Sequence, residues 1–119
     1  MDFIQNYNHK LNAIKQYSLN TSIKHSQECW DKYPSKRKKL FNECSYRAAH
    51  LFHVYNDSKR RLKQKKNEMS SACAVKYEGD IEGLRQCRID MYKELLNDVE
   101  SLHRKMLREE ERYKQELSK

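Results

Sequence analysis

Glycine and proline are scarce in this chain of 119 residues, which contains two glycines and one proline. A protein built from strands and tight turns needs more of both, because these residues supply the backbone conformations that turns require. The abundance of Lys, Glu, Leu and Gln instead favours helix at exposed positions. We therefore predict an all-α fold, namely an extended helical hairpin of two long helices plus an N-terminal amphipathic helix, stapled by disulfides.

Long apolar runs are also missing. No stretch approaches the roughly 20 apolar residues that a membrane-spanning helix needs. Residues 1–7 contain neither an apolar secretory run nor an arginine-rich, acid-poor presequence, so we expect any import into an organelle to depend on an internal signal. The two glycines, Gly79 and Gly83, are too few for a phosphate-binding loop, and no zinc-protease motif occurs. We expect no catalytic residue, no cofactor and no metal site, and hence no enzymatic activity.

The positive charge is concentrated in one part of the chain. Residues 36–66 contain eleven Lys or Arg and two acids, a net charge of +9, whereas the remaining residues sum to −1. Such a basic segment suits acidic protein surfaces, cardiolipin or other anionic lipid head groups, or nucleic acid, although it is also typical of a plain solvated helix face.

Apolar residues recur at steps of three and four over three segments, as in amphipathic helices. The first segment spans residues 3–17 and is weakened by the polar run at residues 18–22. Pro34 must end this helix, because the residue before a proline is pushed out of the α region, and Ser35 is a suitable N-cap for the next helix. The second helix is predicted at residues 36–72. Gly79, in a left-handed conformation, should cap the C-terminal end of this helix, and Asp80 should cap the start of a third helix that begins at Ile81.

The apolar stripes of these helices are narrow, since 37% of the residues are apolar and 35% are charged. A stripe that finds no cover within its own chain must find it on a partner. We therefore expect association with the other subunits of a large assembly, and divide the chain into an N-terminal helix with its connector (residues 1–28) and a stapled hairpin (residues 29–119). The side chains predicted to contact partners are Phe41, Tyr55, Tyr92, Leu95, Val99 and Leu102.

Four cysteines, an even number in a small helical chain, favour a disulfide framework. A zinc site and four free thiols remain as alternatives, although the chain lacks the close cysteine pairs of zinc knuckles. If residues 36–72 form one helix, Cys44 and Cys73 lie about 43 Å apart, far beyond the roughly 7 Å that a disulfide allows. We therefore predict the local pairs Cys29–Cys44 and Cys73–Cys87, one across each helix break.

Disulfides without a secretory signal point to the mitochondrial intermembrane space, where small helical proteins with paired cysteines are oxidised on arrival. Within the second pair, the segment from Cys73 through Glu78-Gly79 to Gln86-Cys87-Arg88, followed by Tyr92 and Leu95, resembles the PDSW subunits of respiratory complex I. The resemblance covers roughly residues 43–95, and the Cys73–Cys87 interval is longer than is usual in that family.

This resemblance implies a structural accessory subunit of mitochondrial NADH dehydrogenase (complex I). Such a subunit takes no part in electron transport chemistry and braces the membrane arm of the respiratory chain complex. It would lie peripherally on the inner membrane, on the intermembrane-space side. Two alternatives stay open. One is an accessory subunit of another mitochondrial assembly, such as cytochrome oxidase, ATP synthase or the mitoribosome. The other is a basic helical protein associated with nucleic acid.

Overall fold

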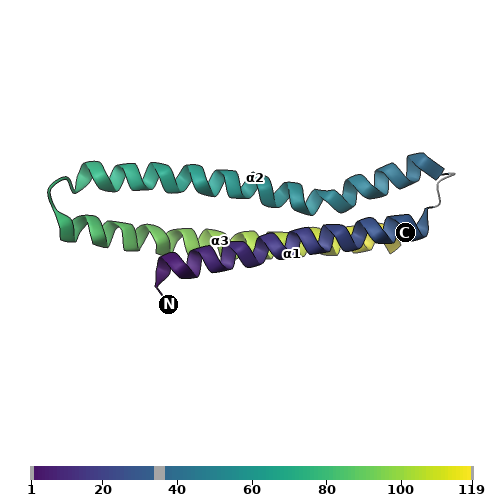
Figure 1. Cartoon of the computed structure of the whole chain (residues 1–119), viewed down its shortest axis with the longest axis horizontal. Coiled ribbons are helices and arrows are strands. Elements are labelled where there is room, and N and C mark those ends of the chain that lie inside the picture. Colours follow the sequence, from purple (N-terminus) through teal and green to yellow (C-terminus); the bar gives the residue numbers. More distant parts are fainter. Residues whose placement is uncertain (1, 34–36, 119) are drawn as a thin grey trace.

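The computed structural model describes residues 2–33 and 37–118, and these form three helices and no strand. The helices are α1 (Phe3–Lys32), α2 (Lys38–Lys76) and α3 (Ile81–Ser118). They lie side by side in an elongated molecule of 67 × 24 × 18 Å (Figure 1). The predicted all-α fold, with two long helices forming a hairpin and an N-terminal helix added to it, is confirmed.

The turn between α2 and α3 forms as its residues require. Gly79 has a φ of +79°, in the left-handed region that costs glycine no strain, and the Asp80 side chain accepts a hydrogen bond from the Gly83 amide at 2.9 Å. Gly83 lies so close to the Tyr77 ring that a Cβ added there would strike it. Both predictions for this turn, a left-handed Gly79 and an Asp80 cap, are confirmed.

One predicted boundary differs from the observed one. α2 continues past residue 72 to Lys76, because no residue between Cys73 and Lys76 breaks a helix and the chain turns only at Gly79. The predicted cap at Ser35 lies outside the described residues.

α1 runs without interruption through residues 18–22, where we expected the helix to weaken. No glycine or proline occurs between Phe3 and Lys32, so nothing in this segment stops a helix. The small polar side chains of Ser18, Thr21 and Ser22 are buried, and the Ser18 hydroxyl donates a hydrogen bond to the Lys15 carbonyl at 2.9 Å. The predicted domain boundary after residue 28 therefore falls inside a continuous helix.

The hydrophobic core is a long seam to which all three helices contribute. Its buried members are Tyr7, Ile14, Leu51, Tyr55, Leu62, Met91, Tyr92, Leu95, Leu96, Val99, Leu102 and Met106. A second, smaller cluster lies near the connection between α1 and α2, and consists of Cys29, Cys44, Ala48 and Tyr113. The apolar stripes thus cover one another within the chain.

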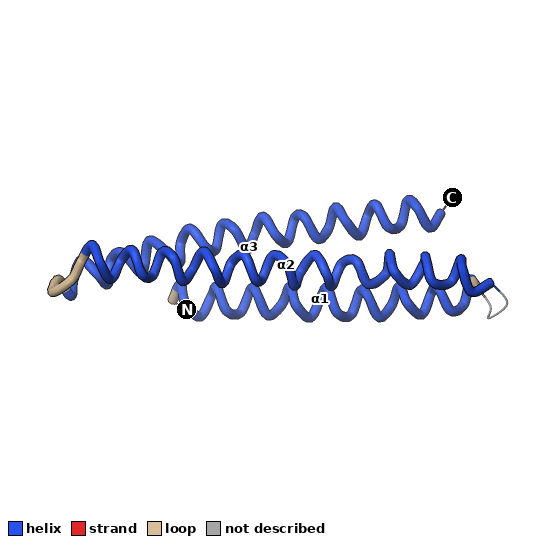
Figure 2. The backbone as a smooth tube through the Cα atoms, turned by 90° about the horizontal axis from the view of Figure 1, so that it is seen from above, coloured by secondary structure: helices blue, strands red, loops and turns tan. Residues whose placement is uncertain are grey.

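α1 does not run the full length of the hairpin. In two perpendicular views the turn between α2 and α3 extends well beyond the N-terminal end of α1 (Figures 1 and 2). The molecule is therefore a three-helix bundle over most of its length and a two-helix hairpin at one end.

Candidate docking surfaces

Most of the side chains predicted to contact partners are buried within the chain itself. Phe41 is half-buried beside the Trp30 ring, with ring centroids 4.7 Å apart. The five others, Tyr55, Tyr92, Leu95, Val99 and Leu102, are at most 9% exposed and belong to the long core. Their assignment as docking residues is therefore corrected, because they lie in the core that the three helices form together.

The two disulfides form the predicted local pairs at opposite ends of the molecule. Cys29 and Cys44 join α1 to α2 with 5.7 Å between their Cα atoms, and Cys73 and Cys87 join α2 to α3 at 5.8 Å. No cysteine in the described part of the chain is free. One disulfide thus joins the two helices on either side of each connection and limits how far they can separate there.

Tyr113 brings α3 against the first disulfide. Its hydroxyl lies 3.8 Å from the sulfur of Cys29 and 3.9 Å from that of Cys44, and donates a hydrogen bond to the His25 carbonyl at 3.4 Å. Burial raises the pKa of the Tyr113 phenol to about 12. All three helices therefore meet at one aromatic side chain next to the Cys29–Cys44 bridge.

A buried histidine with two glutamates lies beside Tyr113. The His25 ring is packed against the Tyr113 ring, with centroids 4.1 Å apart. Its Nδ1 lies 3.1 Å from a Glu28 carboxylate oxygen, and its Nε2 lies 3.6 Å from a Glu110 oxygen. Tyr17 donates a hydrogen bond to the other Glu110 oxygen, and burial together with this bond raises the Tyr17 pKa. This polar cluster fastens α1 to the C-terminal half of α3.

Sequence reasoning missed this cluster. Its members are separated by up to 93 residues in the chain, as Tyr17 and Glu110 are, and neither belongs to a recognisable motif. The available signal was the periodicity of α3, which places Tyr113 one further heptad beyond Met106 on the same face. His25 gave no signal of its own, because a polar residue in a polar run is ordinarily exposed.

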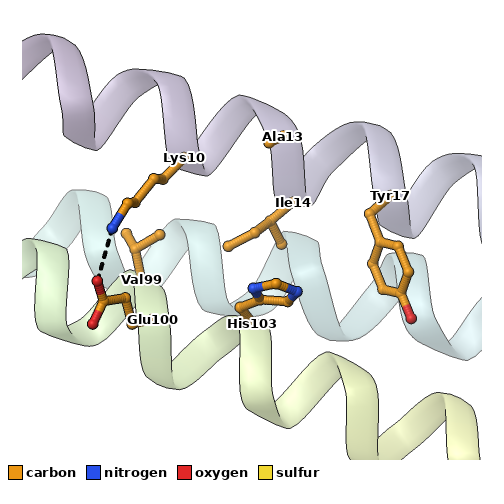
Figure 3. A pocket seen from close by; sticks show the side chains of 7 residues that line it. All are labelled: Lys10, Ala13, Ile14, Tyr17, Val99, Glu100 and His103. Atoms are coloured by element: carbon orange, nitrogen blue, oxygen red, sulfur yellow. Dashed lines mark hydrogen bonds and ion pairs between the residues drawn. The ribbon is translucent and has the colours of Figure 1, made fainter.

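A groove of about 520 Å³ lies between α1 and α3 near the middle of the bundle (Figure 3). Ile14 and His103 face each other across its middle, and Tyr17 lies at one end. At the other end Lys10 spans the gap to Glu100 at 2.7 Å, and this contact lowers the Glu100 pKa. The groove is open to solvent and mostly apolar, so it can receive an apolar side chain.

A second groove, of about 460 Å³, lies between α2 and α3 and is cationic. Arg61, Lys105 and Arg108 line it, and none of them forms an ion pair within the part of the chain that the structure describes. Lys65 also lines it but is engaged by Glu94 at 2.9 Å and Asp98 at 2.7 Å. The basic segment predicted from the sequence is therefore partly neutralised within the chain, and of its cations Arg61 and Lys65 line this groove.

Over residues 2–33 and 37–118, no helix is both long and apolar enough to cross a membrane. In the same residues no three His, Cys, Asp or Glu side chains are arranged to hold a metal ion. His50, one of two histidines on the same face of α2, has its Nε2 3.4 Å from a carboxylate oxygen of Glu109 in α3.

Comparisons with protein-family models, with curated proteins and with solved structures found no match to this chain.

Proposed function

We propose that this chain is a non-catalytic structural accessory subunit of mitochondrial complex I, bracing the membrane arm from the intermembrane-space side. The observation that carries the proposal is the clamped turn between α2 and α3. The segment that resembles the PDSW subunits forms this turn, with the Cys73–Cys87 disulfide closing it and Gly79 in the left-handed conformation. The resemblance thus falls on a defined structural unit.

The shape of the molecule supports a bracing role. A rod 67 Å long with a disulfide near each end holds its helices in fixed relative positions. Its grooves are shallow and open, and they offer side chains and charges for docking. A rigid rod loses little conformational freedom when it docks, so more of the contact energy is available for holding neighbours together.

The two disulfides and the cationic groove support the location. Structural disulfides persist in oxidising compartments and are rare in reducing ones. On the intermembrane-space face, Arg61, Lys105 and Arg108 would meet acidic neighbours or anionic lipid head groups, with each cation near a charged surface contributing about 1 kcal/mol.

The test is removal of the distal clamp in cells that express the protein. Cys73→Ser combined with Cys87→Ser should reduce the amount of assembled complex I while leaving the turnover of each assembled complex near normal. Ser71→Ala, at an exposed position on the same helix, is the matched control and should change neither quantity. Unchanged amounts of complex I in the double variant would contradict the proposal.

A second candidate, a nucleic-acid-associated protein, is favoured by the unpaired cations of the groove between α2 and α3. It requires that the chain co-purify with RNA and that salt release it, because phosphate contacts are exchanged for counterions. Replacing Lys105 and Arg108 with Glu should then abolish the association.

A further inference from the structure

The face of α3 that α1 covers continues beyond the end of α1. Contacts between the two helices begin near Tyr92, whose ring centroid lies 5.7 Å from that of Tyr7, and extend to Tyr113 beside His25. Counting back from Tyr92 in helical steps of three and four, the same face carries five more side chains. These are Ile81, Leu84, Arg85, Arg88 and Ile89. α1 begins at Phe3, so no helix of the described residues covers this part of α3.

The uncovered stretch forms one side of a groove of about 430 Å³. Phe3 and Ile4 close its end from α1, while Leu84 and Ile89 are half-buried along its length. Ile81 is 81% exposed, and Ile4 is 47% exposed. Several large apolar side chains therefore face solvent together at the two-helix end of the molecule seen in Figures 1 and 2.

Two unpaired cations border this groove. Neither Arg85 nor Arg88 forms an ion pair with another described residue. Among the described residues that line the groove, Asp2 alone is acidic, and its carboxylate already accepts a hydrogen bond from the Gln5 amide at the start of α1. The groove therefore combines an apolar lining with two arginines that form no ion pair within the described chain.

We infer that this groove binds an acidic amphipathic helix of a partner protein, lying along α3 where α1 leaves it uncovered. Spacing at three and four residues is how one helix receives another, and carboxylates on the flank of the incoming helix would pair with Arg85 and Arg88. The inference deepens the proposed function, in which the partner is a neighbouring subunit. A helix suits the site better than a flat membrane surface does, because Leu84 and Ile89 are half-buried in a groove between two helix ends.

The direct test measures binding of designed helical peptides to the full chain by fluorescence anisotropy. One peptide of about three heptads carries Leu at the a and d positions and Glu at e and g, and the other carries Lys in place of Glu. The Glu peptide should bind the wild-type chain about tenfold more tightly than the Lys peptide. Arg85→Glu with Arg88→Glu should reverse this preference.

The matched control is Lys59→Glu with Lys63→Glu, which makes the same change of charge at two exposed positions of α2 that line neither this groove nor the cationic groove. It should leave both affinities within about twofold of wild type, and circular dichroism should show both variants folded. Equal binding of the two peptides, or equal effects of the two variants, would overturn the inference. Displacement of the Glu peptide by vesicles of anionic phospholipid would also overturn it and would assign the groove to a membrane. Displacement by a second copy of the chain would overturn it as well and would assign the groove to self-association.

These outcomes are separate from those that test the proposed function. The peptide preference is measured on the purified chain and needs no complex I. If the chain shows the peptide preference but never migrates with complex I, the inference about the groove stands and the proposed function is contradicted. If the chain migrates with complex I but shows no peptide preference, the proposed function stands and the inference about the groove is contradicted.

Discussion

The two disulfides offer a comparison in which loop length is nearly constant and packing differs. Cys29–Cys44 and Cys73–Cys87 have sequence separations of 15 and 14 residues, so the chain-entropy model assigns about 3 kcal/mol to each. Their surroundings are unlike. Cys29 and Cys44 are 0% and 5% exposed within a cluster that includes Tyr113, whereas in the other bridge Cys73 is 3% exposed but Cys87 is only half-buried.

Replacing both cysteines of a pair with alanine isolates the effect of packing. Cys29→Ala with Cys44→Ala removes two sulfurs from beneath Tyr113 and leaves a cavity, which adds on the order of 1 kcal/mol. We therefore expect a loss of about 4 kcal/mol for this pair and about 3 kcal/mol for Cys73→Ala with Cys87→Ala. Because the bridges lie at opposite ends of the rod, the losses should add in the variant that lacks all four cysteines.

The assay is urea unfolding followed by circular dichroism, with the free energy of unfolding extrapolated to water. Reduction of the wild-type chain is an independent control and should approach the stability of the variant without cysteines. A loss below about 1 kcal/mol for the Cys29–Cys44 pair, or a larger loss for the Cys73–Cys87 pair than for it, would refute the reasoning.

Three further predictions concern the core and the cluster around His25. Leu95→Ala, at a fully buried position, should cost about 3 kcal/mol of unfolding free energy, whereas Leu107→Ala, on the same helix but 47% exposed, should cost under about 1 kcal/mol in the same urea assay. Tyr17→Phe removes the hydroxyl that donates to the Glu110 carboxylate of α3 and should lower the free energy of unfolding by about 1–2 kcal/mol. Tyr46→Phe, at a position that is 75% exposed, should leave the unfolding midpoint unchanged. Burial raises the folded-state pKa of Tyr113 to about 12, so its stabilising contribution is complete below about pH 10 and is lost as the pH rises through 12. Tyr113→Phe should therefore flatten the fall in unfolding free energy at alkaline pH. An unchanged slope in this variant would contradict the prediction.

The helices and the disulfide pairs could be predicted from the sequence because they depend on local signals. Gly79 and Asp80 mark the second turn by their own chemistry, and helical rise alone excludes a bridge between Cys44 and Cys73. The end of α1 close to Pro34 agrees with the sequence, but the helix is not weakened at residues 18–22 as the polar run there predicts. In the bundle, the small side chains of Ser18, Thr21 and Ser22 are buried, and the Ser18 hydroxyl donates to the Lys15 carbonyl.

The partner surface could not be predicted, because a stripe on one helix does not show which neighbour covers it. Tyr92, Leu95 and Val99 form an apolar seam that serves equally well for a partner or for the chain's own helices. The structure places α1 and α2 against it. What stays uncovered is the continuation of that seam around Leu84 and Ile89, and it is exposed because α1 begins at Phe3 and the hairpin extends beyond it.

The measurement that tests the central proposal most directly is a native gel of mitochondrial membranes from cells expressing the protein, with a second, denaturing dimension. The chain should migrate with the band that stains for NADH dehydrogenase activity, and should leave that position when its Cys73–Cys87 clamp is removed. Migration of the wild-type chain as a small free species, or with RNA-containing particles that salt disrupts, would contradict the proposal that it braces complex I.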